Sequence, residues 1–530
     1  MSTLLTGATG TTTATAPRRD WLAGRGPWTR RDVLAALLVG VVVVAVVAVF
    51  RSAIVPTDPW RYVLYARAFP YESAAPLGPS RYGMVLPLLP LVAVFGDAEV
   101  VYYVWPLLGA GLLAASVHLV GVRFWGQLPA ALAVVLALSA PITFINLSRG
   151  YPDVQSTGLL ALALVLALVA RDRHRRGPAA VALLLAVGFL LGWAFEARET
   201  TVLLWPVIAL VLWRRGQVLR RAGWVIAAMA LWAVADVVIS GIAYGDPWLR
   251  VNAFARQDLA TGTLPADDRA RATYVGRSRW FYLAAIPRLL WTTAPGGAWT
   301  VVVMAVGALG VLSRRGGTRF VTLVFLLAYL GFVAITGFLS PDHPSGRIDL
   351  QRYWISFLPF AGLAAAAVVT DVADALGPRT RSRRGWELRL VAAVLVAAGP
   401  LVTLGVYLAT APQLVVNGAH QLSELRNHLA TSTDGPVRIH TDAYTQRLLP
   451  TYRQGPFGGE ERWSGTVHTL SAGSAPAPGD LVALRPPTDP TCGACAGATA
   501  RWYVAGGAVQ ASWTEVWAAE GRRLVLYRVG

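Results

Sequence analysis

Eleven apolar stretches run through the first three quarters of the chain, and most are near the length that crosses a bilayer as a helix, about 20 residues, while a few are shorter. They lie near 33–50, 101–120, 128–145, 155–170, 179–195, 201–213, 223–242, 297–313, 320–339, 354–370 and 390–409. Charged residues make up only 14% of the chain, and the mean hydropathy is +0.50. Soluble domains carry about 25% charged residues, so the sequence predicts an α-helical polytopic membrane protein with about 11 spans.

Arginines predict how these spans are oriented. Every second connection is short and basic, and six such segments hold 22 arginines, in the ranges 18–31, 123, 171–176, 214–221, 314–319 and 379–389. Short arginine-rich loops stay in the cytoplasm, so we expect a cytoplasmic N-terminus and an extracytoplasmic C-terminus.

The same alternation predicts the domain organisation. Residues 1–30 form a disordered cytoplasmic tail and residues 31–409 the transmembrane domain. The outer loops of that domain are 51–100, 243–296 and 340–353, and residues 410–530 form an extracytoplasmic domain.

The basic composition excludes several functions. The net charge is +18, but the arginines are spread over loops beside the membrane rather than gathered in one stripe, which argues against nucleic-acid binding. The chain contains no lysine, so it has neither a Walker A lysine nor a lysine for a Schiff base.

The last 120 residues alternate strand-like and helical patterns. Strands are expected at 437–442 and 481–485, helices at 418–430 and 442–449, and a hairpin over 514–529 that turns at Glu520-Gly521. A small α/β domain is predicted.

This domain holds both cysteines, Cys492 and Cys495. One CxxC pair supplies only half of a structural zinc site, and the predicted compartment is oxidising. A local disulfide is the first interpretation, and a redox role is the alternative.

Asp58 begins the first outer loop, directly before Pro59. Trp60, Val63 and Leu64 fall on one face of the helix that should follow, so we expect this helix to lie along the membrane surface. Asp before Pro is a common helix start, and Asp58 could serve only as an N-cap. Capping and catalysis are compatible, because a capped carboxylate has a fixed direction.

Asp153 opens a later span at its outer end and has the same two interpretations. Arginines also occur at the outer ends of spans, against the usual bias. These are Arg61, Arg67, Arg81, Arg149, Arg198, Arg347 and Arg352. Guanidinium groups at headgroup depth bind phosphate oxygens bidentately, so as a set they favour an anionic lipid ligand.

Further ionisable residues lie at the same depth. Glu196, Glu199 and His343 are possible supporting residues or ligands of a divalent cation, and Asp236 lies inside the seventh span. Their spacing matches no specific metal motif, so the metal and the cofactor remain unassigned.

Four segments together resemble the GT-C glycosyltransferases, and within them the group of protein O-mannosyltransferases and lipid A aminoarabinose transferases. The segments are Asp58-x-x-Arg61-Tyr62, Arg81-Tyr-Gly-x-x-x-Pro87 leading to Phe95-Gly96, Asp153 followed by 159–164, and Gln351-Arg352-Tyr353 leading to Leu358-Pro359. The resemblance covers residues 30–370, in order.

The resemblance implies a transferase that moves a sugar, with inversion, from a polyprenyl-phosphate carrier to an acceptor hydroxyl on a glycan, lipid or protein outside the cytoplasmic membrane. Asp58 would be the general base, Asp153 would support the site or bind the acceptor, and the carrier phosphate would contact Arg61, Arg81 and Arg352. Two alternatives are a transporter or flippase of a lipid-linked or small substrate, and a non-catalytic protein of envelope assembly.

Overall fold

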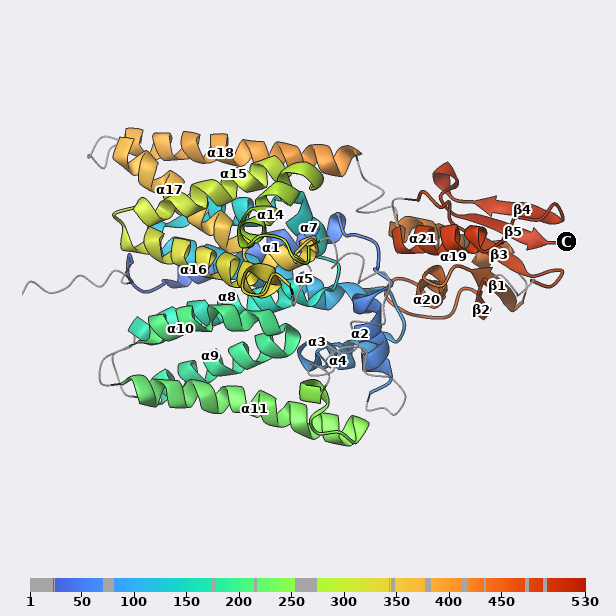
Figure 1. Cartoon of the computed structure of the whole chain (residues 1–530), viewed down its shortest axis with the longest axis horizontal. Helices are drawn as coiled ribbons and strands as arrows, with labels where there is room; N and C mark the ends of the chain where they lie inside the picture. The colour runs from blue at the N-terminus through green and yellow to red at the C-terminus, as the bar shows by residue number, and fades with distance from the viewer. Residues whose placement is uncertain are drawn as a thin grey trace, which may run out of the picture.

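The computed structural model describes residues 22, 24–69, 81–172, 177–213, 217–252, 274–342, 344, 348–376, 383–410, 418–432, 435–471, 476–489 and 493–530. A bundle of long helices forms one end of the molecule, and a smaller part that contains a sheet forms the other (Figure 1). The short helices α2, α3 and α4 lie where the two parts meet.

Eight helices within the described residues are long and apolar enough to cross a membrane, judged by length and composition. They are α1 (Arg30–Val49), α5 (Val100–Trp125), α8 (Pro152–Asp172), α9 (Pro178–Ala197), α11 (Val218–Tyr244), α16 (Gly316–Val333) with its extension η4 (Ala334–Phe338), α17 (Leu358–Leu376) and α18 (Arg383–Thr410). Each coincides with one predicted stretch, so the prediction of a helical, multi-pass membrane protein is confirmed.

The other three predicted stretches are shorter or interrupted. They correspond to α6 (Gln127–Leu138) with α7 (Pro141–Asn146), to η1 (Glu199–Leu204) with α10 (Trp205–Leu212), and to α15 (Gly297–Ala308) with η3 (Leu309–Leu312). The break between α6 and α7 has a local cause. Pro141 disfavours helical backbone at Ala140, which is extended with ψ 123°.

Small residues let some of these helices pack at very short range. A Cβ on Gly188 of α9 would lie 2.1 Å from the Val225 carbonyl oxygen of α11, and one on Gly192 would lie 2.6 Å from Trp232 Cδ1. Only glycine fits at these points. Close approach through small residues is the usual way in which membrane helices associate.

Short helices line the end of the bundle that was predicted to be extracytoplasmic. They are α2 (Asp58–Arg67), α3 (Tyr82–Val85), α4 (Leu88–Phe95), α14 (Arg279–Thr293) and η5 (Gln351–Ser356). The helix predicted after Asp58 is present as α2, but Trp60 and Val63, on the face expected to meet the membrane, pack in a hydrophobic core of the protein. Its N-cap is Thr57, and no side chain caps it.

The C-terminal domain contains one five-stranded sheet in the order β2-β1-β3-β5-β4. Strands β1 (Val437–Thr441), β2 (Gly465–Thr469) and β3 (Leu481–Leu484) are parallel, whereas β4 (Trp513–Ala518) and β5 (Val525–Val529) form an antiparallel edge. The helical elements are α19 (Gly418–Ser432), α20 (Thr445–Leu448), η7 (Leu449–Tyr452), α21 (Gly493–Val504) and η9 (Glu520–Arg522). The predicted α/β class is correct, but β2 and α21 were not predicted.

One hydrophobic core joins this domain to the bundle. It combines Tyr62, Val63 and Ala66 of α2 with Leu422, Leu425 and Leu429 of α19 and with parts of α3, α4, α5 and η7. Across the same contact, Arg426 Nη1 donates to Glu99 Oε1 at 2.8 Å, and both side chains are buried. The domain is therefore packed directly on the helix that begins with Asp58.

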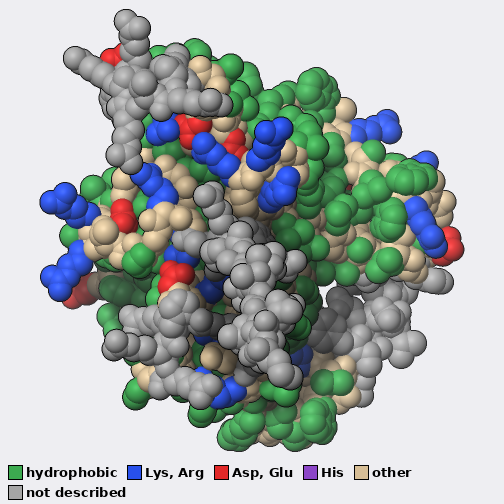
Figure 2. All heavy atoms as spheres, turned by 90° about the vertical axis from the view of Figure 1, so that its left-hand side faces the viewer, with side chains coloured by type: hydrophobic (Ala, Val, Ile, Leu, Met, Phe, Trp, Pro, Cys, Tyr) green, Lys and Arg blue, Asp and Glu red, His purple; other side chains and the backbone are tan. Residues whose placement is uncertain are grey.

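Arginines gather at the opposite end of the bundle, among apolar side chains (Figure 2). Positively charged groups at one end of a bundle are what the predicted cytoplasmic face requires. The orientation in the membrane stays a prediction.

Cys495 is disulfide-bonded. Cys492 lies outside the described residues, so its pairing with Cys495 also stays a prediction.

Candidate active site

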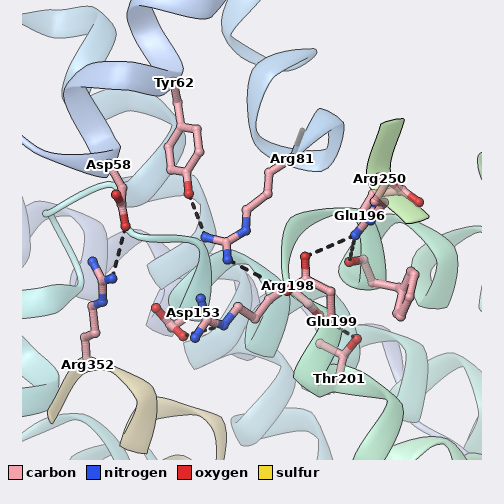
Figure 3. A network of polar contacts seen from close by, with 11 residues as sticks. Asp58, Tyr62, Arg81, Asp153, Glu196, Arg198, Glu199, Thr201, Arg250 and Arg352 are labelled. Atoms are coloured by element: carbon pink, nitrogen blue, oxygen red, sulfur yellow. Dashed lines mark hydrogen bonds and ion pairs between the residues drawn. The ribbon is translucent and has the colours of Figure 1, made fainter. Parts of the chain in front are cut away.

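Asp58 stands at the first residue of α2, and its carboxylate faces Arg352 (Figure 3). The distance from Asp58 Oδ2 to Arg352 Nη2 is 3.0 Å. The side chain of Asp58 is 29% exposed, so it keeps access from outside the protein. Because Thr57 is the N-cap, the interpretation of Asp58 as a mere cap is wrong.

Arg352 comes from η5 and is held by aromatic rings. Its guanidinium carbon lies 4.2 Å from the ring centre of Tyr151 and 5.2 Å from that of Tyr353. The hydroxyl of Tyr151 in turn lies 3.4 Å from the Thr57 hydroxyl, beside Asp58. Burial alone would lower the pKa of Arg352, but Tyr353, Asp58 and Asp153 outweigh it and raise that pKa. The cation is thus fixed beside the carboxylate.

Arg81 reaches the site from the start of α3. It donates from Nη1 to the Tyr62 hydroxyl oxygen at 2.8 Å, and its Nη2 lies 3.8 Å from Glu199 Oε2. Burial raises the pKa of Tyr62 to about 12, so this phenol stays protonated. Gly83 lets α3 pack closely against α9, because a Cβ at this position would lie 2.4 Å from the backbone nitrogen of Ala197.

Asp153 lies in the first turn of α8 and is only 2% exposed. Its Oδ1 is 3.2 Å from Nε of Arg198, whose guanidinium carbon lies 4.1 Å from the ring centre of Tyr353. Burial raises the pKa of Tyr353, but Arg198 and Arg352 outweigh this effect and lower that pKa. Tyr353 therefore lies between the two arginine–aspartate pairs.

A third cluster extends the network toward α11. Arg250 is bound to Glu196 through Nη1 and lies 3.3 Å from Glu199 Oε1 through Nη2. It also donates to the Phe195 carbonyl oxygen at 3.1 Å. Figure 3 shows Glu199 placed between Arg81 and Arg250, so this glutamate links the cluster to the rest of the site.

These contacts bear on the possible metal ligands. Glu196 and Glu199 both face guanidinium groups, which balance their charge. Asp236 lies close enough to Arg250 for an electrostatic attraction between the two side chains. The described residues contain no group of three His, Cys, Asp or Glu side chains that could hold a metal ion. His343 lies outside the described residues. The residues seen here do not fit a metal centre.

The charges of the network balance, with four arginines facing four carboxylates, Asp58, Asp153, Glu196 and Glu199. Two more arginines flank it without a carboxylate partner among the described residues. Arg61 lies on α2, one turn after Asp58, and Arg149 precedes Tyr151, with a buried Nε that has no hydrogen-bond partner. Among the described residues, the arginines of this region therefore outnumber the carboxylates that pair with them.

The sequence predicted most of these residues but not their partners. Asp58, Arg81, Asp153, Glu196, Glu199 and Arg352 lie in one connected network. Arg61 lies on α2 but makes no contact within it. Arg198 was predicted only as one of the outer arginines that favour an anionic ligand, and not as the partner of Asp153. Arg250 was not predicted at all, although an arginine in a predicted outer loop is itself against the positive-inside bias.

No family model matches the chain, and no curated protein matches it. Among solved structures, ArnT from Cupriavidus metallidurans bound to undecaprenyl phosphate matches with a TM-score of 0.52 and 13% identity, over 93% of this chain and 97% of that one. The apo structure of the same protein matches with a TM-score of 0.50 and 14% identity, over the same shares. The likeness shows the fold, and the fold is that of the GT-C glycosyltransferases, as the sequence resemblance predicted.

Proposed function

We propose that this chain, which has the GT-C fold, is a membrane glycosyltransferase. It transfers a sugar from a polyprenyl-phosphate carrier to a hydroxyl of a glycan, lipid or protein acceptor. The reaction takes place at the outer face of the cytoplasmic membrane, where α2, α3 and η5 meet.

The observation that carries this proposal is the position of Asp58. It is a partly exposed carboxylate in the first turn of α2, and a guanidinium held by aromatic rings lies beside it. A carboxylate in hydrogen-bond reach of an acceptor hydroxyl is worth about 10²–10⁴-fold as a general base. Arg352 meets Asp58 through Oδ2, at 3.0 Å.

The proposed transfer is a single displacement and needs no covalent enzyme intermediate. The acceptor oxygen attacks the anomeric carbon of the sugar, its proton passes to Asp58, and the bond from the sugar to the carrier phosphate breaks. The configuration at that carbon inverts. The products are the glycosylated acceptor and polyprenyl phosphate.

Arginines suit the leaving phosphate. Its developing charge is stabilised best by cations that are already in position. Arg81 and Arg352 are held by Tyr62 and Tyr151, and Arg61 pairs with no carboxylate in the part of the chain that the structure describes. Support also comes from the fold neighbour, which binds undecaprenyl phosphate. A carrier confined to the interface would reach these side chains without a deep pocket.

Asp153, Glu196 and Glu199 have a different part in this proposal. They hold Arg198, Arg250 and Arg81 in place, and Asp153 supports the site rather than reacting. We also propose an N-terminus in the cytoplasm and a C-terminal domain outside. A reporter fused after residue 420 should read extracytoplasmic, and a cytoplasmic reading would overturn this topology.

A transporter or flippase would need ionisable groups at mid-depth along a path. The candidate network instead lies at one end of the bundle, next to the C-terminal domain, which favours a transferase. A non-catalytic assembly protein would have no use for an accessible Asp58.

The direct experiment uses the purified full-length protein in nanodiscs with a panel of polyprenyl-phosphate hexoses and pentoses. Release of polyprenyl phosphate that depends on Asp58 and on an added acceptor fraction from the cell envelope is the expected result. If no donor in the panel binds or turns over, and undecaprenyl phosphate itself does not bind, the proposal fails.

A further inference from the structure

A cavity of about 530 Å³ lies at the end of the bundle away from the candidate active site. It is a wedge between the first residues of α9, the first turns of α11 and the end of α8, and we call it the α9–α11 wedge. Its lining residues are Ala170, Gly177, Pro178, Ala180, Val181, Ala182, Leu184, Leu185, Gln217, Arg220, Arg221 and Trp224. Nothing in the proposed transfer reaction uses it.

The wedge results from the way in which α9 and α11 pack. The two backbones nearly touch at Gly188, where the Val225 carbonyl leaves no room for a Cβ. Toward the N-terminal ends of both helices, Leu184, Leu185 and Arg221 take the place of glycine, and the helices are held apart. The cavity therefore lies between the described parts of this helix pair.

The lining divides by chemistry. The part formed by α8 and α9 is aliphatic, whereas the first turn of α11 contributes Gln217, Arg220 and Arg221. The lining contains no acid. The acid at the end of α8, Asp172, is bound bidentately by Arg123, at 2.6 and 2.8 Å. The positive charge at the mouth is thus not neutralised by a lining carboxylate.

The outer wall of the wedge faces the bilayer. Leu219 is 88% exposed and Trp224 40%, and both belong to a helix of membrane-spanning length. A site that is aliphatic inside, basic at its mouth and open toward lipid matches a phospholipid in both of its parts. The acyl chains would fill the aliphatic part, and an anionic headgroup would meet the arginines.

We propose that the α9–α11 wedge binds one anionic phospholipid, with its phosphate at Arg220, Arg221 and Gln217. The lipid comes from the leaflet opposite the candidate active site. Arg221 also donates to the Leu212 carbonyl oxygen at 3.4 Å, so it joins the site to α10, while Arg220 is exposed and supplies the adjustable charge.

This site concerns the same two helices that carry part of the active site. Glu196 ends α9, and Ser240 near the end of α11 lies 2.9 Å from the Tyr82 hydroxyl of α3. A lipid that fills the wedge holds the near ends of α9 and α11 at a fixed spacing. Its loss should lower the stability of this helix pair first.

The test is native mass spectrometry of the full chain in detergent with added phosphatidylglycerol or phosphatidylcholine. One phosphatidylglycerol should bind selectively, and Arg220→Gln should weaken it about tenfold, the lower end of what a charge-assisted contact of roughly 1.5–3 kcal/mol supplies. Val181→Phe should also weaken it by filling the aliphatic part while keeping both arginines. Arg319→Gln is the matched control, because Arg319 is exposed on α16 outside the wedge.

Three results would overturn the proposal. Equal binding of phosphatidylglycerol and phosphatidylcholine would mean that the site does not select for a negative headgroup charge. Equal losses in Arg220→Gln and Arg319→Gln would mean that only the general positive surface matters. Competition by glycerol phosphate at the same concentration as the lipid would mean that a free phosphate, and not a lipid, is the ligand. Each of these outcomes leaves the proposed transferase activity untouched, because the wedge lies outside that site.

Discussion

Asp58 and Asp153 begin two helices in similar ways, yet their surroundings differ. Each stands next to a proline, and each faces one arginine, Arg352 or Arg198. Asp58 is 29% exposed and lies on a surface helix, whereas Asp153 is 2% exposed on a membrane-spanning one. A base must reach its substrate, and a buried ion pair cannot. We therefore propose that Asp58 is the base and that Asp153 holds Arg198 and, through it, Tyr353 in place.

The largest expected effect tests the first half of this comparison. Asp58→Asn should lower kcat for sugar transfer by about 10²–10⁴-fold, because asparagine keeps the shape and loses the basicity. Expression, melting temperature and undecaprenyl phosphate binding should stay close to those of the parent protein. Activity within a few-fold of the parent, with a donor and acceptor shown to react, would remove Asp58 from the catalytic role.

Asp153→Asn tests the second half and should act on stability. It leaves the buried Arg198 without its counter-charge, which costs about 3–5 kcal/mol when a buried pair is broken from one side. The melting temperature and the folded yield should fall. The double variant Asp153→Asn with Arg198→Gln should recover much of this loss, because no unpaired charge remains.

A different outcome would break the comparison. If Asp153→Asn keeps its melting temperature and loses as much activity as Asp58→Asn, then both aspartates take part in the reaction. The assignment of Asp153 to support would then be wrong.

Arg352→Ala tests whether the arginine beside Asp58 binds the carrier phosphate, which an arginine that only pairs with a surface acid should not do. We expect undecaprenyl phosphate to bind about tenfold more weakly, since one charge-assisted contact is lost. Arg61→Ala and Arg81→Ala should behave similarly. Arg67→Ala is the control on the same helix as Arg61, because Arg67 pairs with Asp97 at 2.8 Å. Unchanged affinity in all three site variants would refute the phosphate assignment.

The smallest effect concerns how α2 is held. Arg447 donates to the Pro56 carbonyl oxygen at 3.2 Å and stacks over Trp60, whose Nε1 donates back to the Arg447 carbonyl oxygen at 2.9 Å. Arg447→Ala should lower kcat a few-fold with little change in the KM for the donor, because Asp58 loses its fixed direction but no substrate contact is removed. Arg522→Ala is the control, since Arg522 pairs with Glu515 on β4. A change in KM alone would contradict a positioning role.

Hydropathy predicted the helices well because crossing a bilayer constrains composition over a whole stretch. It did not separate α6 from α7, although Pro141 carries the signal for the break. Strand β2 was missed because its five residues, Gly465–Thr469, are mostly polar and exposed and so lack the alternation that marks a half-buried strand.

The sequence indicated many of the individual residues of the candidate site, but it did not indicate which acid pairs with which arginine. Acids and arginines at the outer ends of spans are unusual enough to be noticed singly. That Asp58 meets Arg352, or that Arg250 meets Glu196, depends on how distant helices pack, and local pattern contains no record of it. Arg250 lies in a loop without any motif, so only the folded structure assigns it.

The contact between Trp60 and Arg447 also limits when α2 can be held in place during synthesis of the chain. The two residues are 387 positions apart, and a ribosome adds roughly 5–20 residues per second, so Arg447 emerges about 20 to 80 seconds after Trp60. During that interval the helix that begins with Asp58 has no partner from the C-terminal domain. A nascent or truncated chain would therefore expose Asp58 on a helix that Arg447 does not yet hold, and that contact would form only near the end of translation.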